Sequence, residues 1–125
     1  MKTKVVNKNK ESYDVYIGRG SIYGNPFTHK KIDKTKALVQ CKTVEQAVNY
    51  YKWWVLGLTK VEGISPPTIE QIRELKGKTL GCFCNQDKPC HGQVLAELAE
   101  ASDEEIEEMK FLYRATRATF TRNIF

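Results

Sequence analysis

The segment from Thr79 to Leu98 constrains the fold more than any other part of the chain. It begins with a short apolar and aromatic run to Cys84, which is typical of a buried strand. Asn85 to Lys88 is polar, and Pro89 is a favoured first residue of a helix. The apolar residues that follow recur at helical spacing: Val94, Leu95 and Leu98. The sequence therefore predicts a strand that runs into a helix N-terminus, where α/β proteins bind phosphates and hold reactive groups.

The size and composition of the chain predict one globular domain. It has 125 residues, of which 41% are hydrophobic, enough for a core. No apolar run approaches the roughly 20 residues of a membrane span, and the N-terminus lacks a hydrophobic signal sequence. We therefore expect a cytoplasmic protein that does not bind membranes, with mostly reduced cysteines.

Positive charge is concentrated in the first third of the chain. Residues 1–42 carry ten Lys or Arg and three acids, whereas residues 43–125 carry ten and twelve. One interpretation is a solvated, lysine-rich surface. The other is a positive field for a phosphate-bearing ligand or for nucleic acid.

Local patterns predict the remaining elements. Lys4–Val6 and Tyr13–Ile17 are β-prone, and we expect them to pair as an edge hairpin. Leu38 and Val39 form a further extended segment, and Cys41 is typical of a buried small hydrophobe. Three capping boxes predict helix starts: Thr43–Gln46, Thr68–Gln71 and Ser102–Glu105.

The predicted helix after Thr43 is rich in aromatic residues. Tyr50, Tyr51, Trp53 and Trp54 follow one another closely and suit either a base-stacking platform or a core. Apolar residues at helical spacing favour the core, with Trp54 and Val55 on the buried face.

The segment from Ile17 to Phe27 has the composition of an anion-binding loop. It contains three glycines, an arginine that can donate two hydrogen bonds to a phosphate, and neutral donors. The candidate phosphate-binding residues are Gly18, Arg19, Gly20, Ser21 and Asn25. The pattern is not a Walker A loop, and an ordinary loop with turn glycines is the alternative.

Cysteine and histidine residues gather where the predicted strand meets the predicted helix. Three thiolates and an imidazole match a structural zinc site in type, and its ligands would be Cys82, Cys84, Cys90 and His91. Neighbouring residues on a helix point about 100° apart, however, which makes joint ligation by Cys90 and His91 awkward. We therefore expect no metal and no cofactor, with zinc as the alternative.

The same residues suit two other roles. A helix N-terminus favours the thiolate of Cys90, and an imidazole titrates near neutral pH, so the candidate catalytic residues are His91, Cys90 and Cys84. Alternatively, the cysteines are small buried residues at a close strand–helix contact.

Two segments, Val15–Phe27 and Leu80–Leu95, together resemble the family called domain of unknown function 4326, found in bacteria and their phages. The similarity covers roughly residues 13–99, and Gln93 stands where an aspartate is usual in the family. Residues 102–125 are a helical extension, packed on the domain or on a partner. A strand followed by Cys-His at a helix start is also similar to domain of unknown function 488.

These resemblances imply a compact, Rossmann-like, three-layer α/β domain over residues 1–101, with a mostly parallel central sheet. The first resemblance also implies that the loop residues Arg19, Ser21 and Asn25 share one pocket with Cys90 and His91. We therefore expect a protein that binds a nucleotide or another phosphate-bearing small molecule, and whether it is an enzyme stays open. The alternatives are a phage-type interaction protein that binds a host protein or nucleic acid, and a zinc-stabilised module.

Overall fold

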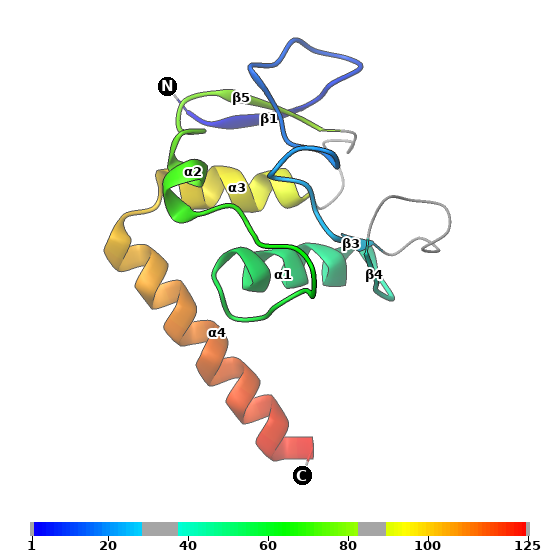
Figure 1. Ribbon diagram of the computed structural model, residues 1–125. Coiled ribbons are helices and arrows are strands. Elements are labelled where there is room, and N and C mark those ends of the chain that lie inside the picture. The colour runs from blue at the N-terminus through cyan, green and yellow to red at the C-terminus, as the bar shows by residue number, and fades with distance from the viewer. Residues whose placement is uncertain (1, 29–37, 83–89, 125) are drawn as a thin grey trace.

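The computed structural model describes residues 2–28, 38–82 and 90–124, with side chains of the last helix described as far as residue 115 (Figure 1). In chain order the elements are β1 (Lys4–Asn7), β2 (Val15–Tyr16), β3 (Phe27–Thr28), β4 (Val39–Gln40), α1 (Val44–Val55), α2 (Ile69–Arg73), β5 (Thr79–Cys82), α3 (His91–Glu100) and α4 (Asp103–Ile124).

The main sheet has three parallel strands in the order β1-β5-β2. Val5 of β1 and Val15 of β2 are both in register with Leu80 of β5. The strands β3 and β4 form a second, two-stranded parallel sheet. The α/β class and the parallel central sheet are therefore confirmed.

The predicted hairpin of the first two strands is wrong. β1 and β2 run in the same direction, and β5 lies between them. Leu80 and Cys82 of β5 are almost completely buried, so this strand occupies the centre of the sheet, where apolar residues are most stabilised.

The connection from β1 to β2 crosses one face of β5. The ring of Tyr13, in this connection, lies so close to Gly81 that a Cβ atom there would be 2.5 Å from the ring Cγ. In Figure 1 this connection passes above the sheet, whereas the labelled helices lie below it. A loop thus covers the face on which a three-layer fold would place helices, and the Rossmann-like three-layer arrangement is not confirmed.

The other face of the sheet is covered by α3. A Cβ atom at Gly92 would be 2.8 Å from both Ile17 Cδ1 and Val5 Cγ1, so the glycine permits this close approach. Leu95 and Leu98 of the same helix are fully buried. The helix predicted after Pro89 therefore positions its first turn directly beside β1 and the end of β2.

The aromatic residues of α1 divide between core and surface. Tyr51 and Trp54 are buried, as is Val55, which confirms the predicted buried face. Tyr50 and Trp53 are half-buried. Cys41 is buried as predicted.

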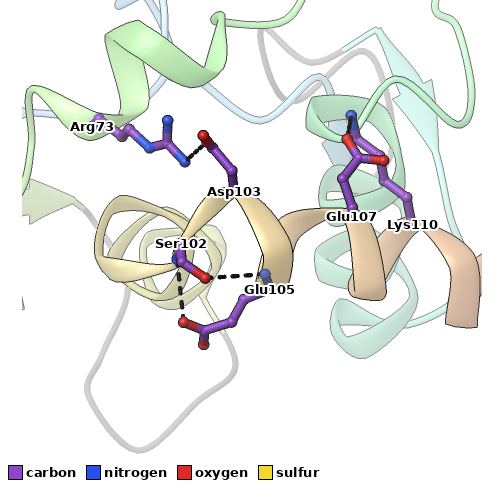
Figure 2. A network of polar contacts seen from close by, with 6 residues as sticks. All are labelled: Arg73, Ser102, Asp103, Glu105, Glu107 and Lys110. Carbon is purple, nitrogen blue, oxygen red and sulfur yellow. Dashed lines mark hydrogen bonds and ion pairs between the residues drawn. The ribbon is translucent and has the colours of Figure 1, made fainter.

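All three capping boxes begin helices. Thr68 and Gln71 exchange both capping hydrogen bonds, whereas at α1 Thr43 Oγ1 accepts from the Gln46 amide and Gln46 Oε1 accepts from Lys42. At α4, Ser102 and Glu105 also exchange both bonds (Figure 2).

The first turns of α4 pack on the body of the protein. Ile106 is buried, and the ring of Tyr113 lies edge-on to Trp53 of α1 with centroids 5.6 Å apart. Arg73 of α2 forms an ion pair with Asp103 (Figure 2). Phe111 and Leu112 are exposed, by 69% and 54%. Among the described residues, no helix is both long and apolar enough to cross a membrane.

Replacement of Trp54 by alanine tests the core. Trp54 is 1% exposed and packs against Phe27 and Tyr51, so Trp54→Ala should lower the free energy of unfolding by about 3–5 kcal/mol. None of the described residues accepts a hydrogen bond from its indole Nε1, so Trp54→Phe should cost clearly less. Urea unfolding of both variants measures this, and equal losses would contradict the assigned packing.

A second prediction concerns the crossover. Gly81→Ala should destabilise the protein by about 1–3 kcal/mol, because the new methyl group overlaps the Tyr13 ring. Tyr13→Ala should remove this penalty, so the double variant should be as stable as Tyr13→Ala alone. If the double variant instead lost the sum of the two single-variant losses in stability, the ring would not lie over β5.

Candidate functional site

The candidate site lies where the loop after β2 meets the first turn of α3. His91 is the first residue of α3, and its Nε2 is 2.7 Å from the carbonyl oxygen of Ile17, directly after β2. Both residues are buried, with His91 only 7% exposed. This hydrogen bond joins the glycine-rich loop to the helix N-terminus.

The same bond determines the tautomer of His91. A carbonyl oxygen only accepts, so Nε2 carries the proton and Nδ1 of the neutral ring is an acceptor. Nδ1 lies 4.0 Å from the sulfur of Cys90. An unprotonated ring nitrogen therefore adjoins a thiol.

The environment of His91 favours its neutral form. Burial lowers its pKa below the usual value of 6.5, and the positive charge of Arg19 lowers it further. The hydrogen bond to Ile17 and the nearby Cys82 oppose this shift without cancelling it. The ring is therefore uncharged at neutral pH.

Cys82 and Cys90 are in direct contact. Their sulfurs are 3.3 Å apart, and both side chains are buried. Cys90 is the N-cap of α3, where its sulfur accepts a hydrogen bond of 3.4 Å from the Gly92 amide. The Cys82 sulfur is 3.8 Å from the carbonyl of Val6.

The guanidinium of Arg19 points back into its own loop. Its Nε donates to the carbonyl of Asn25 and its Nη2 to that of Phe27, both at 3.0 Å. Arg19 therefore holds the loop in shape and places a fixed positive charge close enough to affect His91.

Ser21 and Asn25 also stabilise the loop. Ser21 Oγ donates to the Gly18 carbonyl at 2.7 Å. Asn25 Oδ1 accepts from the Phe27 amide at 2.9 Å. Gly20 has a positive φ of 98°, which permits the turn. The predicted ligand-binding side chains thus make internal hydrogen bonds.

Tyr51 is a neighbour of the site that the sequence did not identify as such. Its ring lies edge-on to His91 with centroids 5.0 Å apart, and its hydroxyl donates to the Tyr23 carbonyl at 2.6 Å. Helical spacing predicted its burial but not its contact with the imidazole. The Ile17 carbonyl was also missed, because a main-chain acceptor has no signal in the sequence.

Two predicted features lie outside the described residues. Cys84 falls in the undescribed segment 83–89, so its role stays a prediction. Among the residues that the structure describes, no three or more His, Cys, Asp or Glu could hold a metal ion together. The expectation that the protein lacks zinc also stays a prediction.

The chain belongs to the family called domain of unknown function 4326, whose model matches residues 2–101. An uncharacterized 12.4 kDa protein of Enterobacteria phage T4, from the nrdA-td intergenic region, is 33% identical over 95 residues. That match covers 76% of this chain and 75% of the phage protein. No solved structure matches the chain. The family match ends at residue 101, directly before α4.

The depressed pKa of His91 predicts a pH-dependent stability. The unfolded state binds a proton near pH 6.5 whereas the folded state resists it, so stability is full above this value and falls as pH is lowered. His91→Gln should reduce this fall, measured by urea unfolding at several pH values. His29→Gln, which removes the chain's other histidine, is the matched control and should keep it. An unchanged pH profile in His91→Gln would show that His91 titrates normally.

Proposed function

We propose that the protein binds a nucleotide or another nucleoside phosphate where the loop 17–27 meets the N-terminus of α3. The observation that supports this most directly is the 2.7 Å hydrogen bond from His91 to Ile17, because it joins two anion-binding elements into one structure. The loop follows β2, and the segment before α3 follows β5. The carboxyl ends of parallel strands are where α/β proteins bind ligands.

The physical basis is positive potential from three sources. The N-terminus of α3 carries a partial positive charge on its amides. Arg19 adds a full charge, held in place by two hydrogen bonds within the loop. Gly18 and Gly20 let the main chain approach a phosphate closely. Since these groups are ordered by internal hydrogen bonds, binding costs less conformational entropy.

A reaction at the bound ligand would use the thiol and imidazole beside it. The neutral Nδ1 of His91 is placed to take the proton of Cys90, which would make the sulfur a nucleophile. Our candidate catalytic residues are thus His91, Cys90 and Cys84. The proposal includes a Rossmann-like arrangement of the sheet and its following helix, and a location in the cytoplasm of the host cell.

A second candidate function is binding to a host protein or nucleic acid. The basic first third of the chain favours it, as do the exposed Phe111 and Leu112 on α4, which lies beyond the family match. In this function the anion site would bind no small molecule. A zinc-stabilised module is the third candidate.

Thermal shift against a panel of nucleotides and sugar phosphates tests the proposal. A ligand present at 100 times its dissociation constant stabilises the folded state by about 2.7 kcal/mol, which is readily measured. For any ligand found, Arg19→Ala should weaken binding, because the variant loses the fixed positive charge of the loop. We expect a loss of about 1.5–3 kcal/mol, the range of an interaction with a charged group.

The matched control is Arg73→Ala, which removes an arginine of α2 that pairs with Asp103 and leaves loop 17–27 intact. It should bind the ligand as the parent does. Because Arg19 also holds its loop, unfolding measurements on both variants separate lost binding from lost folding. A panel without any stabilising ligand would favour the interaction protein, as would unchanged affinity in Arg19→Ala.

A further inference from the structure

The contact between Cys82 and Cys90 places two thiols close enough for thiol–disulfide chemistry, which is independent of ligand binding. One thiol ends the central strand and the other caps the following helix, and their sulfurs are 3.3 Å apart. A disulfide bond is about 2.05 Å long, so the sulfurs need to approach by about 1.2 Å. Gly92 keeps α3 close to the sheet, which holds the two thiols together.

The two thiols differ in their surroundings. Cys90 receives a hydrogen bond from the Gly92 amide and lies beside the unprotonated Nδ1 of His91. The Gly92 amide stabilises a thiolate, the form of cysteine that attacks a disulfide, and Nδ1 of His91 can accept the proton that Cys90 loses. The sulfur of Cys82 lies near the Val6 carbonyl, an acceptor that favours the protonated thiol. Cys90 is therefore the attacking thiol and Cys82 the resolving one.

We propose that Cys82 and Cys90 are a reactive dithiol that low-molecular-weight disulfides oxidise to an intramolecular disulfide. Cys90 gives its proton to His91 and attacks one sulfur of the small disulfide, which releases the first small thiolate and leaves a mixed disulfide. Cys82 loses its proton and attacks the Cys90 sulfur, which releases the second thiolate. The two thiolates take up the two protons. The protein loses two electrons, and one small disulfide becomes two thiols.

Oxidation would change the candidate site directly. The new bond would join the end of β5 to the first turn of α3 and close a ring over the seven intervening residues. It would also remove the thiol beside His91 and consume the sulfur that caps α3. The oxidised protein would therefore lack the nucleophile of the reduced one.

The experiment equilibrates the reduced, full-length protein with graded ratios of reduced to oxidised glutathione. Samples are quenched with acid, unfolded, alkylated and weighed by mass spectrometry. We expect two of the four cysteines to escape alkylation, with a mass loss of two hydrogen atoms and no bound glutathione. Cleavage before Asp87, which lies between Cys84 and Cys90, should leave fragments joined by the disulfide.

Single variants identify the partners. Cys82→Ser and Cys90→Ser should abolish the internal disulfide and leave at most a glutathione adduct. Cys41→Ser and Cys84→Ser are matched controls that should form it as the parent does. The readout needs no nucleotide, so its outcome is independent of the proposed function.

Several results would contradict the proposal that Cys82 and Cys90 are a reactive dithiol. These are alkylation of all four cysteines at every glutathione ratio, glutathione adducts alone in the parent, or loss of the bond in Cys84→Ser. One zinc per chain in the purified protein, lost on Cys82→Ser, would also overturn it, because the thiols would then be metal ligands. That last result would equally contradict our expectation that the protein lacks zinc.

Discussion

The structure depends on the burial of β5 between two parallel neighbours. Its backbone donates and accepts on both edges, while Leu80 and Cys82 are excluded from water. Both faces are covered at very short range, by Tyr13 over Gly81 and by α3 through Gly92. Side chains at these two glycines would separate the layers. Such close packing brings the end of the strand and the start of α3 near enough for their sulfurs to touch.

The local part of the fold could be predicted from the sequence, but the order of the strands could not. Strand β5, helix α3 and the capping boxes have strong signals within ten or so residues. Strand pairing is a long-range choice, and the short connection between Lys4–Val6 and Tyr13–Ile17 favoured a hairpin. The apolar β5 displaced that pairing because burying it between them removes more apolar surface from water. Gly81 is a residue that this strand order requires, because the ring of Tyr13 packs directly on it. Tyr13 is 68 positions away in the sequence, so local patterns could not show the contact.

Most residues of the candidate site could be named from the sequence, but the arrangement of their side chains could not be predicted. The family resemblance implied that residues of the loop 17–27 share one pocket with Cys90 and His91, and the bond between His91 and Ile17 joins the two segments. The direction of the side chains was not predictable. Arg19 was expected to point at a ligand, yet its acceptors are the carbonyls of Asn25 and Phe27. A folded loop must provide hydrogen-bond donors for its buried main-chain oxygens. Every residue carries such an oxygen, so the residue types do not show which ones a side chain will bind.

This internal use of donors limits what the site can recognise. Arg19 acts on its surroundings largely through its charge, and the α3 N-terminus acts through the partial charge of its amides. Potential of this kind attracts any anion, because it depends on charge and distance and not on the shape of the ligand. His91 adds no charge at neutral pH, since burial and Arg19 both hold it neutral. In the proposed function, selection among phosphates would therefore come from contacts with the rest of the ligand, and the buried imidazole and thiols would supply any chemistry.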